Sequence, residues 1–245
     1  MSALVRSELL KLRSVRSIVV LWLLAVALGI GFSLLGPLAV PSDQIEEVGD
    51  NFGLAMAGLG ICQVLLGVVG ILAITQEQRF HTLRLTFAVE PRRLRALVAK
   101  VAAVAIVCLA ATVVVVPLAL AGGMAVLEAK GFSVDLGDPG VARALVWSVL
   151  NGVLFGVIGY GIGAVLRSAA GAITTFVVWQ LVVESALVAL LPDIGKWAPF
   201  QSATTVQRPT FAEESLGVLS AALVWLGCTI ALAVAGTILV IRRDA

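Results

Sequence analysis

Long apolar stretches separated by short polar segments dominate the chain. Each stretch has about 20 residues or more, which is the length a helix needs to cross a hydrocarbon layer about 30 Å thick. The stretches cover residues 17–38, 52–75, 101–127, 141–166, 170–191 and 217–241. The alternating polarity over about 10 residues that is typical of membrane β-strands is not seen. The pattern predicts an all-α polytopic membrane protein, with residues 1–245 forming one transmembrane domain of six helices.

The first 16 residues differ from the apolar stretch that follows them. Val5, Leu9 and Leu12 recur at helical spacing, which predicts a short amphipathic helix lying at the membrane surface. A plain basic flank on the first span is the alternative. The charged residues of this predicted interfacial helix are Arg6, Glu8, Lys11, Arg13 and Arg16.

Positive charge is distributed unevenly between the polar segments. If the N-terminus is cytoplasmic, residues 1–16, 76–100, 167–169 and the C-terminal tail lie inside, and they hold 13 of the 17 basic residues. The outer segments hold only Lys130, Arg143, Lys196 and Arg208, together with ten of the 15 acidic residues. Short cytoplasmic loops are enriched in Lys and Arg. We therefore expect a multi-pass protein of the bacterial cell membrane with both termini in the cytoplasm.

Composition agrees with lipid as the main solvent. Hydrophobic residues make up 60% of the chain and charged residues 13%, whereas a soluble domain has about 25% charged residues. The net charge of +2 gives no indication of nucleic-acid binding. Cys62, Cys108 and Cys228 each lie inside an apolar stretch, where small buried side chains are expected.

The sequence lacks the usual signatures of catalysis. It has no GxxxxGK[ST] motif for binding ATP, and its single histidine, His81, argues against a multi-histidine metal site. No Ser-His-Asp or Cys-His set can be assembled within one membrane layer. We therefore expect no catalytic residue, no metal and no cofactor bound by this chain itself.

Polar residues within the spans are the candidates for a substrate path. Glu184 is the clear ionisable case, and it must be near an interface, protonated or partnered. It could line a path or a helix contact, or lie close enough to the outer surface to stay hydrated. Trp179 and Gln180 lie at a similar depth, whereas Gln63 and Asn151 are weaker candidates that favour interhelical hydrogen bonding.

Glycines are dense in the fourth stretch. Two GxxxG spacings occur, Gly152/Gly156 and Gly159/Gly163. Small residues at this spacing let helix backbones approach closely, so they predict helix packing and no specific activity.

The basic segment 76–100 is more elaborate than a connection requires. Pro91 should end any helix just before it, which predicts a short helix over about 80–87, a break and a new helix. Such a segment could form a compact docking element on the cytoplasmic face. A solvated basic loop that only sets the topology is the alternative.

Three features of the chain resemble the permease subunits of ABC-2 type exporters. The N-terminal Glu8-x-x-Lys11-Leu12-Arg13-Ser14-x-Arg16 is similar to the interfacial helix of that family. Glu77, Thr82-Leu83, Pro91-x-Arg93 and Ala99-Lys100 look like its first cytoplasmic loop, with His81-Thr82 where the family often has Gly-Thr. The long segment 192–216 is similar to its extracellular insertion.

The resemblance implies a transporter with two permease subunits, identical or sister chains, and two separate ATPase subunits that bind ATP and Mg²⁺. The substrate would be amphiphilic: drug-like, peptide or lipid-like. By the same resemblance, Gln63, Trp179, Gln180 and Glu184 flank the substrate path. The residues implied to couple the chain to the ATPase are Glu77, Arg79, Thr82, Leu83, Pro91, Arg92 and Arg93.

Two functions from other classes remain open at this point. A membrane anchor, regulator or immunity protein would move nothing and would not depend on an ATPase. A lipid-modifying intramembrane enzyme would need clustered catalytic polar residues, which this sequence does not contain.

Overall fold

The computed structural model describes residues 1–48, 50–80, 82–90, 92–210 and 216–243. Among them, six helices are long and apolar enough to cross a membrane. They are α2 (Arg16–Ala39), α5 (Leu59–Arg79), α7 (Arg93–Ala129), α8 (Pro139–Leu166), the run Ala169–Leu190 and α13 (Val218–Arg243). The described part contains no strand. The prediction of an all-α, multi-pass membrane fold is confirmed.

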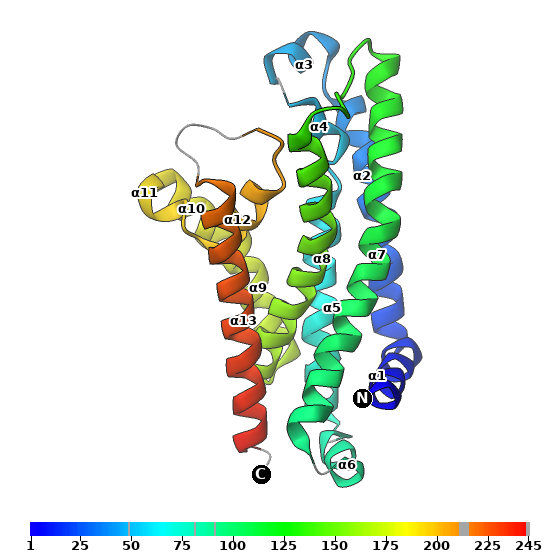
Figure 1. Cartoon of the computed structure of the whole chain (residues 1–245), viewed down its shortest axis with the longest axis vertical. Coiled ribbons are helices and arrows are strands. Elements are labelled where there is room, and N and C mark those ends of the chain that lie inside the picture. The colour runs from blue at the N-terminus through cyan, green and yellow to red at the C-terminus, as the bar shows by residue number, and fades with distance from the viewer. Residues whose placement is uncertain (49, 81, 91, 211–215, 244–245) are drawn as a thin grey trace.

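Both termini lie at the same end of the helix bundle (Figure 1), which we call the terminal end. This end also carries α1 (Ser2–Ser14) and α6 (Thr82–Val89). The opposite end, called the distal end, carries α3 (Ser42–Val48) and α4 (Asn51–Ala55). The short helices α11 (Pro192–Gly195) and α12 (Pro199–Val206) lie toward the distal end beside α13.

Helices α5 and α8 form the centre of the bundle. The most apolar window of α5 is 67% buried, whereas that of Ala169–Leu190 is only 11% buried. Close contact depends on glycine, because a Cβ on Gly70 would meet the carbonyl of Gly156 and one on Gly159 would meet the carbonyl of Gly67. The outer helices therefore leave broad apolar surfaces for lipid or another chain.

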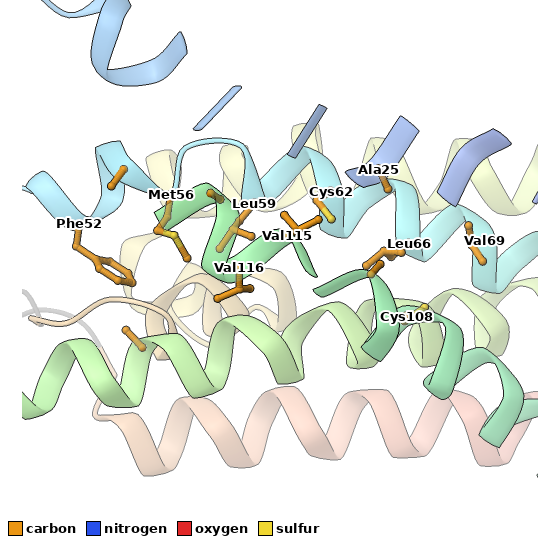
Figure 2. Close-up of a cluster of buried hydrophobic side chains, with 14 of the residues drawn as sticks. Ala25, Phe52, Met56, Leu59, Cys62, Leu66, Val69, Cys108, Val115 and Val116 are labelled. Carbon is orange, nitrogen blue, oxygen red and sulfur yellow. The ribbon is translucent and has the colours of Figure 1, made fainter. Parts of the chain in front are cut away.

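The largest apolar core joins α2, α4, α5 and α7 (Figure 2). Its fully buried residues include Leu66 on α5 and Val115 on α7. Cys62 and Cys108 lie in this core as free thiols, while Cys228 is half-buried. The two core cysteines thus act as small packing residues.

Some helix bounds differ from those expected from hydropathy alone. The stretch expected over 52–75 is divided into two helices. The first, α4, is capped by the Asp50 carboxylate, which accepts the backbone N–H of Gly53 at 2.7 Å, and it ends at Ala55. The spanning helix α5 then runs from Leu59 to Arg79. Helix α7 starts at Arg93, eight positions before the expected start, and continues past Pro117. The basic connection is therefore shorter than the 76–100 expected.

The fifth span contains a break in its helical pattern. A π-helical turn, Trp179–Val183, separates α9 (Ala169–Val178) from α10 (Glu184–Leu190). Residues 192–216 were expected to form a long outer loop, but its described part folds into α11 and α12. Five of the eight α12 residues are buried, so α12 packs into the bundle. Single π-helical turns such as Trp179–Val183 are often found at functional sites.

Candidate functional site at the terminal end

Helix α6 lies between the ends of α5 and α7, at the terminal end of the bundle (Figure 1). Its start follows the end of α5, where the Phe80 N–H donates to the Gln76 carbonyl at 3.0 Å. The helix ends at Val89, before Pro91, which lies outside the described residues together with His81. The short helix predicted over 80–87 is thus present over 82–89.

An apolar cluster joins α6 to four spanning helices, α5, α7, α8 and α13. Leu83 is buried in a cluster with Ile74 of α5, Leu97 of α7 and Val240 of α13. Phe87 packs against the same cluster. Because these helices come from both halves of the chain, a displacement of α6 would be passed to several spans at once.

Arg93 ties the start of α7 to both α6 and α13. Its guanidinium lies over the Phe87 ring, 5.5 Å from the ring centre. It also donates a hydrogen bond of 3.3 Å to the Ile241 carbonyl near the end of α13. Of the residues implied to couple to an ATPase, Arg93 is therefore engaged within the chain.

Four charged residues form a network behind α6. The Lys100 ammonium on α7 contacts the Glu8 carboxylate and lies 2.8 Å from the Glu77 carboxylate. Lys11 lies 2.5 Å from Glu8 and 3.3 Å from Glu77. Lys11 also donates to the Thr86 hydroxyl at 3.1 Å. The network, Glu8–Lys11–Glu77–Lys100, joins α1, α5 and α7 and extends to α6 through Thr86.

This network is partly removed from water. The side chains of Glu8 and Lys100 are 4% and 3% exposed, so each charge depends on its partners. Burial would raise the pKa of Glu8, but the two lysines outweigh burial and hold that pKa below its usual value. Burial likewise opposes the charge of Lys11, yet Glu8 and Glu77 raise its pKa above the usual value. All these effects favour the charged, closed network at neutral pH.

The other predicted residues at this end differ in their surroundings. Thr82 is exposed and its hydroxyl lies 3.5 Å from the Glu77 carbonyl. Glu77 keeps one buried carboxylate oxygen without a hydrogen bond. The exposed arginines among the predicted residues are Arg6, Arg13, Arg16, Arg79 and Arg92. They leave a basic outer surface around α6 and α1.

Glu184, predicted to flank a substrate path, caps α12 within the chain. Its two carboxylate oxygens accept the backbone N–H groups of Phe200 at 3.2 Å and Gln201 at 2.8 Å. The Trp179 indole donates to the same carboxylate at 2.9 Å. Glu184 is only 3% exposed in the single chain, which does not fit a hydrated surface position. A carboxylate at a helix N-terminus satisfies N–H groups and complements the helix dipole.

Helix α12 and the following residue, Gln207, also form hydrogen bonds with other polar residues of the spans. Gln63 on α5 exchanges two hydrogen bonds with Gln207, at 2.9 and 3.3 Å. Asn151 on α8 donates to the Ala203 carbonyl at 2.7 Å and accepts from the Trp225 indole at 2.8 Å. Gln180 is separate, since its buried amide oxygen has no hydrogen-bond partner. Gln63, Asn151 and Glu184 therefore fasten α12 and its end to three spans.

The four glycines predicted for helix packing all lie in tight contacts. A Cβ on Gly152 or Gly156 would meet Thr112 or Cys108 of α7. One on Gly159 or Gly163 would meet α5 at Gly67 or at Ile74 and Ile71. The small-residue face of α8 thus contacts α5 and α7 at once.

Sequence reasoning gave no structural role to Lys100, Thr86 or Gln207. In the sequence, Lys100 fits the topology pattern and the family resemblance. Its place within a span follows from the early start of α7 at Arg93, and a lysine inside a span needs a partner. The buried position of α12 had a weaker signal, the Pro199 start followed by an amphipathic turn.

The described residues contain no group of three or more His, Cys, Asp or Glu residues that could hold a metal ion. The ion pairs of the terminal-end network make it an electrostatic junction between α1, α5 and α7. No protein-family model and no curated protein matches this chain.

Proposed function

We propose that this chain is the permease subunit of an ATP-driven exporter of the ABC-2 type. The observation that carries the proposal is α6, a short helix at the terminal end that is packed on α5, α7 and α13 and bonded to α1. A simple connection between two spans needs no such anchoring. In the proposal, separate ATPase subunits bind ATP and Mg²⁺ and contact α6 from the cytoplasm of a bacterial cell.

The motion of the ATPase would enter the membrane through α6. Leu83 and Phe87 transmit displacement to the bundle by packing, and Lys11 transmits it to α1 through Thr86. Because packed interiors are stiff, a push on α6 moves its neighbours rather than deforming a loop. The interfacial helix α1 and the spans would then shift together.

The substrate path in this proposal lies between two permease copies. Within one chain, Gln63, Asn151 and Glu184 are occupied in fastening α12. The Ala169–Leu190 run has the lowest buried fraction of the six spans. A second copy or a sister permease facing this run would enclose a largely apolar passage, which suits an amphiphilic, drug-like, peptide or lipid-like substrate.

The test reverses exposed charges beside α6. Arg92→Glu with Arg95→Glu should weaken co-purification with the proposed P-loop ATPase subunit and reduce substrate-stimulated ATP hydrolysis. Arg93 is spared, because its contacts with Phe87 and Ile241 would confuse lost docking with misfolding. The matched control is Arg6→Glu, an exposed arginine on α1. Unchanged assembly and hydrolysis in the double variant would contradict the proposal.

A membrane anchor or regulator without transport is the second candidate. The observation that favours it is the use of Gln63, Asn151 and Glu184 in hydrogen bonds that hold α12 within one chain. This candidate predicts that deleting the proposed ATPase changes neither the abundance of the chain nor its effect in the cell. The exporter predicts that the effect is lost.

A further inference from the structure

A cavity of about 780 Å³ opens at the terminal end, next to the pocket that holds Lys11, Glu77 and Lys100, with which it shares Val15, Leu72, Gln76 and Phe80. Three segments that are distant in sequence line it: the α1–α2 junction, the end of α5 and the turn between α8 and α9. Each segment contributes one arginine, namely Arg16, Arg79 and Arg167. No acidic side chain occurs in the described lining. The cavity therefore has a strongly positive wall.

Two helix N-termini add to this positive charge. The first residues of α2, Arg16 and Ser17, and those of α9, Ala169 and Ala170, line the cavity. The first N–H groups of a helix have no acceptor within the helix, and the helix dipole places partial positive charge there. Two such ends beside three guanidinium groups make a favourable place for an anion.

Gln78 supplies an independent sign of a ligand. Its side chain lines the cavity and is 8% exposed, yet neither its amide nitrogen nor its amide oxygen has a hydrogen-bond partner. Buried side-chain amides are normally satisfied, because leaving them unpaired is unfavourable. A bound polar group in the cavity would remove this deficit.

The backbone at Arg167 adopts an uncommon conformation. Arg167 has φ of 58°, in the left-handed region that favours glycine, and it ends α8. This turn places Arg167 in the lining of the cavity.

An apolar strip leads from the cavity along the membrane-facing side of α2. On α2, Val20 and Leu24 follow Arg16 at four-residue spacing and are 53% and 44% exposed. On the α9 side, the exposed apolar residue Val178 lies two turns beyond Ala170, with the exposed Thr174 between them. Residues at these spacings lie on one helix face. A soluble anion would not need such a strip, whereas acyl chains would lie along it.

We propose that this cavity binds the phosphate group of an anionic phospholipid in the leaflet at the terminal end. Arg16, Arg79 and Arg167 face the charge, the N–H groups at the starts of α2 and α9 donate to phosphate oxygens, and Gln78 donates to the headgroup. The acyl chains lie against α2. The inference does not rest on transport and applies equally if the chain is a static anchor.

The experiment measures lipid retention by native mass spectrometry after purification from nanodiscs of phosphatidylcholine doped with phosphatidylglycerol. The intact chain should retain phosphatidylglycerol selectively. Arg16→Gln with Arg79→Gln should bind it on the order of tenfold more weakly, since charge-assisted hydrogen bonds are lost. The control pair Arg6→Gln with Arg92→Gln removes the same charge at the same end, outside the cavity, and should retain the lipid.

Two further measurements separate loss of binding from misfolding and distinguish a lipid phosphate from a soluble one. Gln78→Leu breaks no hydrogen bond of the empty protein, so it should fold normally and still retain less phosphatidylglycerol. Millimolar glycerol 3-phosphate should not displace the lipid. Equal loss in the control pair, or full retention in Gln78→Leu and the Arg16/Arg79 variant, would overturn the proposal. Displacement by glycerol 3-phosphate would assign the cavity to a soluble phosphate and overturn the lipid assignment.

Discussion

Lys100 and Glu8 form a buried ion pair across 92 positions of sequence, joining the seventh helix to the first. A buried pair of this kind adds little when compared with an apolar pair, but breaking it by removing one partner costs about 3–5 kcal/mol. It therefore fixes where α1 docks. The pair is the natural starting point for testing the terminal-end junction.

Replacing Lys100 with methionine should destabilise the protein strongly. Glu8 would remain buried without its main partner, and we expect the melting temperature in detergent to fall by on the order of 10 °C. Adding Glu8→Gln to Lys100→Met removes the stranded charge and should restore part of the loss. A Lys100→Met variant as stable as the parent would show that the pair does not hold α1.

The network should respond to acid in a defined direction. The pKa of Glu8 lies below its ordinary 4.5, so its stabilising effect is present above pH 4.5 and is lost as the pH falls through the folded value. The pKa of Lys11 lies above 10.5, so its contribution is present below that pH and lost in stronger base. Thermal stability should thus fall more steeply in acid for the parent than for Glu8→Gln. Equal acid slopes would argue against this assignment.

The cap on α12 can be tested by hydrogen exchange. Glu184→Leu removes the acceptor for two backbone N–H groups, a loss of about 1–3 kcal/mol, and should speed exchange over residues 199–206 by roughly tenfold or more. Glu184→Gln keeps one carbonyl acceptor and should fall in between. Gln180→Leu, on the π-helical turn that precedes Glu184, is the control and should leave this exchange unchanged. Unaltered exchange in Glu184→Leu would show that Glu184 does not hold α12 in place.

Glycine contacts give a packing prediction with an internal control. Gly159→Ala places a methyl group against the Gly67 carbonyl of α5 and should destabilise the bundle by about 1–3 kcal/mol. Gly60→Ala, on α5 with open space around it, should be neutral or slightly stabilising. Thermal unfolding of the two variants side by side measures the difference. Similar stabilities would mean that α5 and α8 are not held together at Gly159.

The spans were predictable because a helix in lipid must be long and apolar, and the sequence displays that directly. The short helix after Phe80 was also predictable, since Pro91 limits its length. The partners of Glu184 were not. They lie 16 and 17 positions away in α12, and hydropathy cannot tell a buried polar helix from an outer loop.

The charged network could not be predicted from the sequence, for a related reason. Glu8 lies in the N-terminal segment, whereas Glu77 and Lys100 lie at opposite ends of segment 76–100, and each charge alone fits the pattern of a cytoplasmic flank. Only the packing of α1 against α7 brings them within contact distance. The arginine cavity has the same origin, because Arg16, Arg79 and Arg167 meet only after the helix ends converge.

Contact between α6 and an ATPase is the central claim, and photo-crosslinking in native membranes tests it most directly. A crosslinking amino acid at Ala88, an exposed position on α6, should capture the ATP-binding subunit. The same amino acid at Leu136, 54% exposed near the distal end, should not. Capture at Ala88 alone is the predicted result. No capture at Ala88, or labelling of Ala88 by a reagent confined to the outside of the cell, would contradict the account.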